Sequence, residues 1–348
     1  MSEESTRVAV IGAGSWGTAL ACVLAGGGGE TYLWARDREQ AAVMQRDRRN
    51  PRYLQEIDIP SSVHITADLA DAVYRVPVII LAVPAKAMRT TTRGISGIMR
   101  TQARHGGDVP LVLSAAKGLD PDSGALMSQV LAESLGDRAV IGAISGPNIA
   151  REVAAGQPAA TVIACADGPR ALDAQHRISS NRLRAYTNDD VVGVEVGGAM
   201  KNVVAIAAGI ADGLGAGDNA KAAITTRGLA EMTRLGTAMG GRARTFSGLT
   251  GMGDLFVTCT SPHSRNRLLG EGIGRGRPLA ELEAEMSMIA EGVNTTREAL
   301  KLGERLGVDL PIARGVARII FDGADVLEVA AQLMERTGRS ETEGLGLG

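Results

Sequence analysis

The sequence has few of the side chains that build disulfide frameworks or metal sites. Its 348 residues include three cysteines and four histidines. The cysteines, Cys22, Cys165 and Cys259, lie far apart and form no Cys-x-x-Cys pair. This pattern disfavours a disulfide scaffold and a thiolate metal site, and it suits a reducing cytosol. We therefore expect a cytoplasmic protein that holds no metal.

An excess of one charge and a long apolar run are also missing. The 37 basic and 39 acidic side chains leave a formal net charge of −2, so the overall charge does not indicate nucleic acid or an anionic membrane as a partner. Residues 8–29 carry no charge, but glycines interrupt them at Gly12, Gly14, Gly17 and 26–29. No apolar block there approaches the roughly 20 residues of a spanning helix, and a cleaved signal peptide is disfavoured too.

The sequence does contain enough chain for two domains and an unusual amount of glycine. A length of 348 residues is too great for one compact core, and 45% hydrophobic with 22% charged residues is typical of a soluble globular protein. Glycine accounts for 45 residues, about twice its usual share of roughly 7%. Because no collagen-like period is present, we expect glycine where the backbone closely approaches a ligand or another helix.

Strand-like runs alternate with helix-like patterns up to about residue 190. Helices are expected at residues 18–25 and 36–48. The expected strands are Val8–Ile11, Thr31–Trp34, 76–83, Leu111–Ser114, 139–144, 161–164 and 183–187. Because these strands are continuously apolar rather than alternating, they predict a mainly parallel sheet that helices cover on both faces.

The pattern changes after about residue 190, where no convincing strand appears. Five helices are expected, at residues 191–210, 219–239, 278–286, 295–306 and 312–321. Gly240 and Gly307 follow two of them as stop signals. We therefore predict an α/β domain over residues 1–190 and an all-α domain over 191–335. Residues 336–348 are polar and glycine-rich, and we expect a frayed tail there.

A glycine-rich motif follows the first expected strand. Residues 12–17, Gly-Ala-Gly-Ser-Trp-Gly, match G-x-G-x-x-G between a strand and a helix. Gly12 allows the tight turn, Gly14 lets the backbone meet a pyrophosphate, and Gly17 lets helix and strand pack closely. The helix N-terminus adds N–H donors and a positive dipole. The motif predicts a doubly wound, Rossmann-type sheet that binds a dinucleotide; a glycine-rich turn without a ligand is the alternative.

The residues after the second expected strand bear on which dinucleotide binds. An acid at this place accepts the ribose 2′-hydroxyl of NAD, whereas an arginine accommodates the 2′-phosphate of NADP. Arg36 comes first here, 24 positions after Gly12, and Asp37 and Arg38 follow. Arg36 therefore favours NADPH through charge pairing with the phosphate. The alternative is a set of solvated charges at a helix start, with Asp37 as the N-cap.

The helix expected at 191–210 is apolar on nearly all sides but carries a lysine. Its polar interior residues are Glu195, Lys201 and Asn202. The side chain of Lys201 would lean over the preceding turn, where Gly197 and Gly198 leave a gap for a small ligand. Burial lowers the pKa of such a lysine, which suits a proton donor to a carbonyl oxygen. The alternative is a lysine that reaches water along the apolar surface.

Further polar clusters could serve a ligand. Glycines precede Asp254 in residues 251–254, and residues 264–267 are Ser-Arg-Asn-Arg. A guanidinium for phosphate, a carboxylate that orders a lysine or a hydroxyl, and hydroxyl and amide donors fit a small phosphorylated, hydroxylated molecule. A helix cap with a surface arginine is the alternative. Lys117 and residues 145–148 follow two expected strands, on the side where open parallel sheets bind ligands.

Longer stretches of the sequence resemble one family. They are IGAGSWGTALA (11–21), AAKGL (115–119), ISGPNIAREV (144–153), VGGAMKNVVAIAAGIADGLG (196–215), NAKAAITTRGLAEMTRLG (219–236), TFSGLTGMGDLFVTCTSPHSRNR (245–267) and AEGVNTT (290–296). With them the chain resembles the bacterial-type NAD(P)-dependent glycerol-3-phosphate dehydrogenases over most of its length. The resemblance implies a Rossmann-type domain and an all-α domain similar to that of 6-phosphogluconate dehydrogenase. It also implies reversible hydride transfer between NAD(P)H and dihydroxyacetone phosphate, giving sn-glycerol 3-phosphate.

The resemblance also implies roles for individual residues. Lys201 matches the catalytic general acid and base, which protonates the ketone oxygen as hydride arrives at the adjacent carbon. The substrate-binding positions match Lys117, Gly146, Asn148, Lys201, Asp254, Ser264, Arg265 and Asn266. The cofactor-binding positions match Gly12, Gly14, Ser15, Trp16, Gly17, Arg36, Lys117, Ala150, Arg265, Ile289 and Glu291. The chain departs from the family at Asn148, where relatives commonly carry Ser or Thr, and at Ala85, where a serine often follows the proline.

Two other functions share parts of this pattern. Another two-domain β-hydroxyacid dehydrogenase would share the glycine motif but lack the cluster at 251–267. A non-catalytic NADPH-binding regulator would tolerate an apolar residue at Lys201, whereas buried polar groups without a use are costly. The family resemblance further implies a small phosphorylated substrate and a role in glycerophospholipid synthesis. A homodimer is compatible with the sequence, because a helical second domain often supplies a dimer surface.

Overall fold

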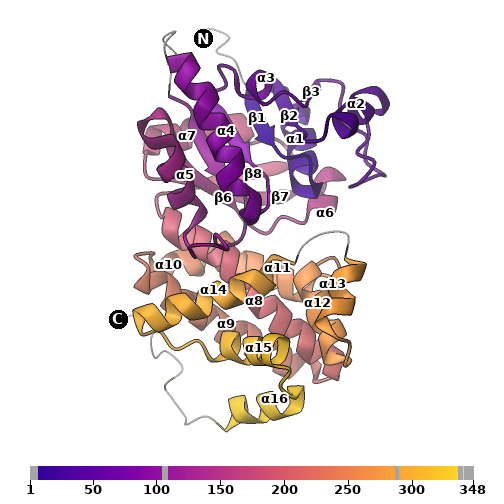
Figure 1. The fold of residues 1–348 in the computed structure, drawn as a ribbon, viewed down its shortest axis with the longest axis vertical. Helices are drawn as coiled ribbons and strands as arrows, with labels where there is room; N and C mark the ends of the chain where they lie inside the picture. The colour runs from indigo at the N-terminus through magenta and orange to yellow at the C-terminus, as the bar shows by residue number, and fades with distance from the viewer. Residues whose placement is uncertain (1–6, 104–108, 287–289, 336–339, 341–348) are drawn as a thin grey trace. The chain divides into compact units, whose positions relative to one another are not determined.

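The computed structural model describes residues 7–103, 109–286, 290–335 and 340 (Figure 1). The chain divides into two units. One takes in Met1–Ala116 and Met127–Val191, and we call it the sheet unit. The other takes in Lys117–Leu126 and Val192–Gly348, and we call it the helical unit. The segment Lys117–Leu126, expected in the first domain, therefore packs with the helices instead.

An eight-stranded sheet forms the centre of the sheet unit, in the order β3-β2-β1-β4-β5-β6-β7-β8. Its strands are β1 Val8–Ile11, β2 Thr31–Trp34, β3 Val63–Thr66, β4 Val78–Leu81, β5 Leu111–Ser114, β6 Val140–Ser145, β7 Ala159–Cys165 and β8 Leu183–Asn188. Every neighbouring pair is parallel except β6 and β7, which are antiparallel. This arrangement confirms the expected α/β class with a mainly parallel sheet.

The strand order reverses beside β1, because β2 lies on one side of it and β4 on the other. Val10 is in register with Leu33 of β2 and with Ile80 of β4, and all three residues are fully buried. In open parallel sheets, ligands bind beyond the carboxyl ends of the strands at such a reversal. The turn after β1 therefore lies where a nucleotide is expected.

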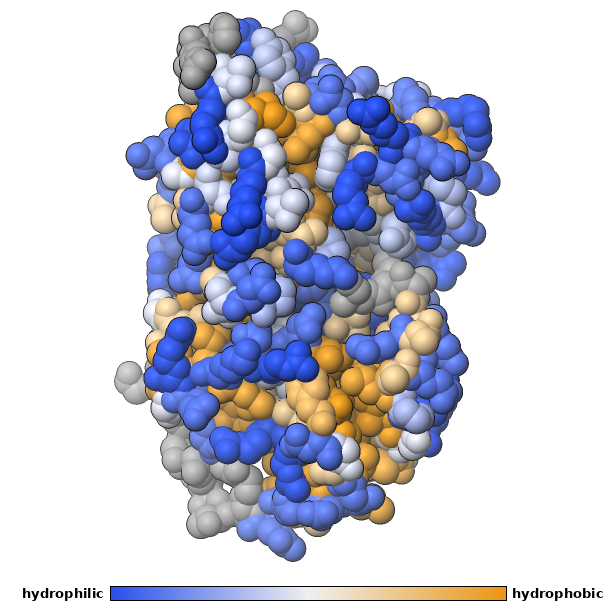
Figure 2. Space-filling view, viewed as in Figure 1, coloured by the Kyte–Doolittle hydropathy of each residue, from blue (hydrophilic) through white to orange (hydrophobic). Residues whose placement is uncertain are grey.

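Helices flank this sheet. They are α1 Ser15–Gly26, α2 Arg38–Asp47, α3 Leu69–Val73, α4 Ala85–Ala103, α5 Met127–Leu135, α6 Ala150–Ala154 and α7 Gly168–Ile178, with a 3-10 turn η1 at Gly136–Arg138. On the face seen in Figure 2, hydrophilic side chains cover the surface around α2. The sequence does not predict β3, because Val63 and Ile65 are buried and His64 between them is exposed. Such alternation on a short strand is a weaker signal than a continuous apolar run.

Helices also build the helical unit, and no strand occurs among its described residues. They are α8 Val191–Leu214, α9 Gly217–Ala238, α10 Ala243–Phe246, α11 Asp254–Thr260, α12 Arg265–Gly274, α13 Leu279–Glu285, α14 Glu291–Leu306, α15 Pro311–Asp322 and α16 Val326–Met334, with a π-helical turn η2 at Leu249–Gly253. Leu119 and Leu126 are buried in the core of this unit, which explains why their segment packs here.

The sequence predicts five of these helices and omits α10, α11, α12 and α16. Helix α10 has only four residues. Glycines lie before α11 and within α12, and glycine is a signal for loops and turns when no structure is known. The expected frayed tail lies outside the described residues except at Ser340.

Helix α8 has the length and composition of a membrane-spanning helix, the one such helix in the described part of the chain. Its most apolar 18-residue window is 83% buried inside the protein, as in a core helix. A Cβ on Gly209 would lie 2.0 Å from the carbonyl oxygen of Arg267, and one on Gly270 would lie 2.1 Å from that of Ile206. No side chain fits at either place, so α8 and α12 meet backbone to backbone, as the abundance of glycine predicts.

Candidate active site

The turn between β1 and α1 requires glycine at two positions. Gly12 has a φ of +120°, and a Cβ there would lie 2.7 Å from the carbonyl oxygen of Ala82. A Cβ on Gly17 would lie 1.8 Å from the carbonyl oxygen of Gly12. Gly12 therefore makes the turn possible, and Gly17 lets α1 pack directly on it.

The N-terminus of α1 has room and polarity for an anion. Gly14 is the N-cap, no side chain caps the helix, and its first turn holds no acid. A Cβ on Gly14 would meet no heavy atom within 4 Å. Ser15 and Trp16 begin the helix, and Trp16 packs against the core. These residues fit the pyrophosphate of a dinucleotide, which binds to the N–H groups of a helix N-terminus.

The end of β2 carries the charges expected to distinguish the two dinucleotides. Arg36 is exposed. Asp37 is the N-cap of α2, and its Oδ1 accepts hydrogen bonds from the N–H of Glu39 at 3.0 Å and of Gln40 at 3.2 Å. Its Oδ2 pairs with Arg52 at 2.7 Å. The bond from Gln40, helped by Arg52, holds the pKa of Asp37 below its ordinary value. Asp37 thus has the capping position that the sequence leaves open as an alternative.

Two expected substrate-binding residues follow β6 and lie against β7. Gly146 has a φ of +152°, and a Cβ there would lie 3.0 Å from the carbonyl oxygen of Ala160. Asn148 Nδ2 donates to the same oxygen at 2.8 Å. Asn148 Oδ1 and Ser145 Oγ are buried and have no hydrogen-bond partner among the described residues. Buried oxygens in this state indicate a place for a ligand or water. Ala150 begins the short helix α6.

The helical unit brings three expected site residues into one ion-pair cluster. Lys201 Nζ, on α8, lies 2.7 Å from Oδ1 of Asp254, the first residue of α11. Lys117 Nζ lies 2.6 Å from the other oxygen, Oδ2. Lys201 also donates to Thr258 Oγ1 at 2.7 Å. The side chains of Lys201 and Asp254 are 8% and 2% exposed, so this carboxylate bridges two cations away from bulk water.

The gap expected beside Lys201 is not present at Gly197. A Cβ on Gly197 would lie 2.7 Å from the carbonyl oxygen of Thr250 in η2. The missing side chain lets η2 pack on α8, and Asp254 follows η2 directly. On the side of Gly197 the space expected for a ligand is therefore filled by η2, and this glycine instead lets the segment that leads to Asp254 pack on α8.

Burial and charge set the protonation states of the pair. Burial, with the nearby charge of Lys117 and against the attraction of Asp254, lowers the pKa of Lys201 to about 8. Burial alone would raise the pKa of Asp254, but the two ammonium groups outweigh it and hold that pKa below its ordinary value. At neutral pH the pair is thus a carboxylate and an ammonium that gives up its proton more readily than an exposed lysine does.

A chain of amides fixes the segments around this cluster. Asn202 Nδ2 donates to the backbone oxygen of Lys117 at 2.8 Å, and Asn266 Nδ2 donates to Asn202 Oδ1 at 2.9 Å. The N–H of Gly292, in α14, donates to Asn266 Oδ1 at 3.0 Å. Asn266 is an expected site residue. Asn202 is noted in the sequence as a polar residue of its helix but is given no role in the site, and Thr258 is missed. Thr258 stands four residues after Asp254, a spacing that would indicate a contact once α11 is known to be a helix.

The remaining expected residues lie at or near the starts of two helices. Ser264 is the N-cap of α12, and its Oγ accepts a hydrogen bond from the N–H of Arg267 at 3.3 Å. Arg265 is the first residue of α12 and is exposed. Glu291 is the first residue of α14. Ile289 lies outside the described residues.

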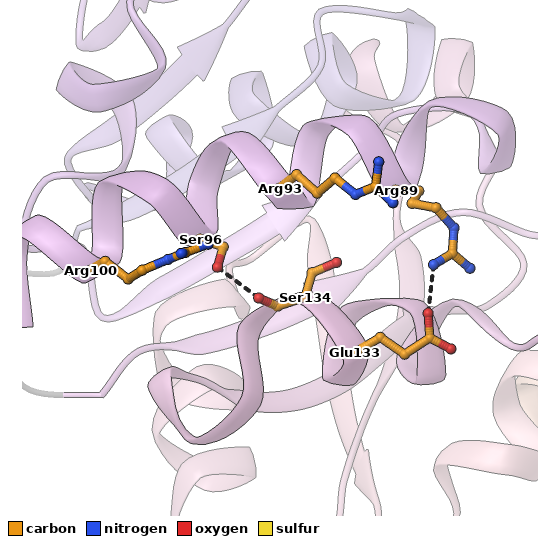
Figure 3. Close-up of a pocket in the computed structure, with 6 residues that line it drawn as sticks. All are labelled: Arg89, Arg93, Ser96, Arg100, Glu133 and Ser134. Carbon is orange, nitrogen blue, oxygen red and sulfur yellow. Dashed lines mark hydrogen bonds and ion pairs between the residues drawn. The ribbon is translucent and has the colours of Figure 1, made fainter.

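A groove of about 490 Å³ lies between α4 and α5 and contains none of the expected site residues (Figure 3). It is lined by Arg89, Arg93, Ser96, Arg100, Glu133 and Ser134. Arg89 pairs with Glu133 at 2.5 Å, and Ser96 Oγ donates to the backbone oxygen of Ser134 at 2.7 Å. Some of the polar groups that line the groove therefore bind one another.

The sheet unit and the helical unit offer complementary chemistry. The turn after β1 accommodates a dinucleotide, and the lowered pKa of Lys201 suits proton exchange with a carbonyl oxygen. A dehydrogenase that uses a pyridine nucleotide needs both capacities, and the fold places the chain in this class. Among the described residues, no group of three or more His, Cys, Asp or Glu side chains could hold a metal ion.

Known proteins narrow this class to one family. The family models described as NAD-dependent glycerol-3-phosphate dehydrogenase N-terminus and C-terminus match residues 7–171 and 190–331. The chain belongs to this family. It is 48% identical over 339 residues to glycerol-3-phosphate dehydrogenase [NAD(P)+] 2 of Salinibacter ruber (strain DSM 13855 / M31), which covers 97% of this chain and 96% of that protein. The expected family, enzyme class and NAD(P) cofactor are thereby confirmed.

Two further relatives agree with this assignment. Glycerol-3-phosphate dehydrogenase [NAD(P)+] of Lysinibacillus sphaericus (strain C3-41) is 45% identical over 339 residues, or 97% of this chain and 98% of that protein. The crystal structure of glycerol-3-phosphate dehydrogenase from Coxiella burnetii is similar with a TM-score of 0.89 at 36% identity, over 95% of this chain and 99% of that chain.

Proposed function

We propose that the protein catalyses the reversible reduction of dihydroxyacetone phosphate to sn-glycerol 3-phosphate, with Lys201 as the proton donor. The observation that carries this proposal is the buried ammonium of Lys201, whose pKa is lowered to about 8 and which is bound to Asp254 and Thr258. The bound nicotinamide supplies the hydride that forms the new C–H bond at the carbonyl carbon. Lys201 gives its proton to the carbonyl oxygen, so that a hydroxyl group forms and the lysine becomes neutral.

Asp254 and Thr258 position this proton. A lysine ammonium has three N–H donors, and Asp254 and Thr258 accept two of those of Lys201. The third N–H has no partner among the described residues and is free for the carbonyl oxygen of the substrate. Lys117 helps to hold the pKa of Asp254 low, so that the carboxylate does not take up the proton that the substrate needs.

We assign the phosphate of the substrate to Arg265. This arginine is exposed at the N-terminus of α12, where the helix dipole and a guanidinium both favour a dianion. The further substrate contacts that we propose come from Lys117, Gly146, Asn148, Asp254, Ser264 and Asn266. The cofactor contacts that we propose come from Gly12, Gly14, Ser15, Trp16, Gly17, Arg36, Lys117, Ala150, Arg265, Ile289 and Glu291.

We propose NADPH as the preferred cofactor, with NADH bound more weakly by the same site. Arg36 is exposed after β2, where a guanidinium pairs with the 2′-phosphate. Both oxygens of Asp37 are engaged by α2 and Arg52, which supports this preference because a free carboxylate would favour NADH.

We also propose a cytoplasmic homodimer that supplies glycerophospholipid synthesis and neither inserts into a membrane nor binds nucleic acid. The balanced charge and the burial of α8 support the last two points. The reaction product supports the role in glycerophospholipid synthesis, because glycerol 3-phosphate carries the backbone and phosphate of a glycerophospholipid.

The decisive experiment follows nicotinamide absorbance with dihydroxyacetone phosphate and, in parallel, with other small keto compounds. We expect dihydroxyacetone phosphate to be reduced with the highest kcat/KM. Faster reduction of a β-keto acid would favour another β-hydroxyacid dehydrogenase and contradict the proposal. Nucleotide binding without turnover of any keto compound would favour a regulator.

A further inference from the structure

We propose that Arg52 sets the nucleotide preference of this enzyme by neutralising Asp37. The inference rests on the proposed function, because it concerns the cofactor of that reaction. Arg52 lies in the loop after α2, outside both the glycine motif and the strand β2.

Asp37 occupies a place where a free carboxylate would favour NADH. An acid just after the second strand accepts a hydrogen bond from the ribose 2′-hydroxyl, and its charge repels a 2′-phosphate. The side chain of Asp37 is 37% exposed, so its charge is open to the solvent from which the nucleotide binds. Without Arg52, the charges of Arg36 and Asp37 would cancel.

Arg52 changes this balance in two ways. Its Nη2 lies 2.7 Å from Oδ2 of Asp37, while Oδ1 already accepts two N–H groups of α2. Both carboxylate oxygens therefore have partners before a ribose hydroxyl arrives. The charges of Arg36, Asp37 and Arg52 together come to +1, which favours the 2′-phosphate of NADPH at the end of β2.

Asn50 fixes the loop that carries Arg52. Asn50 is fully buried, and its Nδ2 donates to the backbone oxygen of Ala13 at 3.0 Å and to Thr18 Oγ1 at 2.8 Å. Its Oδ1 accepts the backbone N–H of Arg52 at 3.1 Å. One buried amide thus joins the glycine turn to the residue that pairs with Asp37, so the backbone of Arg52 is held in place relative to that turn.

Arg49 offers a matched control. Its Nε pairs with Oδ1 of Asp58 at 2.7 Å, the distance found for Arg52 and Asp37. The two arginine side chains are 56% and 58% exposed. Asp58 does not lie at the end of β2, so removal of Arg49 leaves Asp37 neutralised.

The test measures the dissociation constants of NADPH and NADH for the purified full-length protein by nicotinamide fluorescence, without substrate. We expect Arg52→Gln to reduce the preference for NADPH over NADH about tenfold, because an uncompensated charge then faces the phosphate. We expect Arg49→Gln to leave the preference unchanged. Equal thermal unfolding midpoints for the two variants exclude a folding defect. An unchanged preference in Arg52→Gln overturns the inference.

Asp37→Asn separates neutralisation from direct binding of the phosphate. Asparagine still caps α2 but carries no charge. If Arg52 acts through Asp37, adding Arg52→Gln to Asp37→Asn leaves the preference unchanged. A tenfold loss in that background as well would mean that Arg52 binds the phosphate itself, and it would overturn the inference.

Because the dissociation constants are measured without substrate, this test is independent of the proposed reduction of dihydroxyacetone phosphate. A protein that shows the expected change in affinity but does not reduce dihydroxyacetone phosphate contradicts the proposed function alone. Normal reduction together with an unchanged preference in Arg52→Gln contradicts the role of Arg52 alone.

Discussion

The two candidate binding surfaces are built in opposite ways. In the sheet unit, the turn after β1 depends on side chains that are missing, because Gly12 and Gly17 leave no room for a Cβ. In the helical unit, the cluster depends on charged side chains that are present: Lys201 and Asp254 are buried, and Lys117 pairs with the same carboxylate from a partly exposed position. A backbone surface is sensitive to size, whereas a side-chain cluster is sensitive to charge and protonation. Removal of a charged side chain in the helical unit should therefore lower kcat, whereas an added side chain at a glycine in the sheet unit should weaken nucleotide binding and stability.

The largest effect is expected where a buried charge is lost. We expect Lys201→Ala to lower kcat about 10³-fold, because the carbonyl oxygen then has no proton donor. Binding of NADPH should change less than twofold, because the nucleotide turn is left intact. Stopped-flow absorbance and fluorescence titration measure the two quantities. Lys301→Ala, which removes an exposed lysine of the same unit, is the control and should keep wild-type kcat. A near-normal kcat in Lys201→Ala would disprove the assigned donor.

In the sheet unit, a methyl group added at Gly17 should weaken nucleotide binding, the quantity that Lys201→Ala leaves nearly unchanged. We expect Gly17→Ala to weaken NADPH binding about 100-fold and to lower the free energy of unfolding by about 2 kcal/mol, because the Cβ meets the carbonyl oxygen of Gly12. Gly26→Ala, at the other end of α1, meets no atom within 4 Å and should do neither. Titration calorimetry and urea unfolding test both points; equal behaviour of the two variants would contradict the steric argument.

A second buried acid of the helical unit should make stability depend on pH. Glu231 accepts hydrogen bonds from the N–H groups of Ile312 at 2.6 Å and Ala313 at 3.3 Å, at the start of α15. Burial raises its pKa from 4.5 to about 7. Between these values the folded protein holds a proton that the unfolded chain has lost, so stability falls as pH rises through this range. We expect a loss of about 3 kcal/mol between pH 4.5 and 7.5, because the pKa shift spans most of this range.

Glu231→Gln should remove this particular pH dependence. Urea unfolding of both proteins at pH 4.5 and 7.5 measures it. The same loss of stability in both proteins would assign the dependence to other groups.

The protonation of Lys201 should be visible in the kinetics. Because burial lowers its pKa to about 8, we expect kcat/KM for ketone reduction to fall about tenfold per pH unit above pH 8. The reverse oxidation needs the neutral amine, so its kcat/KM should rise as pH approaches 8. Rates recorded from pH 6 to 10 in both directions test this. A reduction rate that stays level up to pH 10 would contradict the lowered pKa.

The smallest effect is expected for a solvent-exposed charge of the sheet unit. We expect Arg36→Ala to weaken NADPH about tenfold more than NADH, because only the phosphate loses a partner. Arg46→Ala, on the exposed side of α2, is the control. Fluorescence titration gives the affinities of both variants for NADPH and NADH. Equal weakening of NADPH and NADH binding by Arg36→Ala would refute a role for this arginine in selecting the phosphate.

The same contrast explains what the sequence could and could not predict. The strands β1, β2 and β5 are predicted to the residue. Strands β1 and β5 are continuously buried apolar runs, and β2 is a run of strand-favouring residues, Thr-Tyr-Leu-Trp, although its burial alternates. Strand β3 is missed because the exposed His64 interrupts its short apolar pattern. The glycine turn is predictable because its spacing is dictated by backbone geometry. Lys201 is predictable as a charged residue in an apolar helix.

Contacts between distant segments are not encoded in any local pattern. Lys117 follows β5 but belongs to the helical unit, because Leu119 and Leu126 are buried there. Arg52 reaches Asp37 across fifteen residues, through a loop whose course depends on Asn50. The residue types of the site could thus be named from the sequence, whereas most of their partners could not.

The backbone contact between α8 and α12 affects the chemistry over a distance. Helix α8 carries Lys201 and α12 carries Asn266, and the two helices touch where Gly209 and Gly270 lie. Gly209 is about 12 Å further along α8 than the lysine, at 1.5 Å per residue. A methyl group at this crossing would push the helices apart and move the ammonium without touching it. Screens for loss of activity should therefore recover alanine at positions that border no ligand, and those variants would report on helix spacing rather than on catalysis itself.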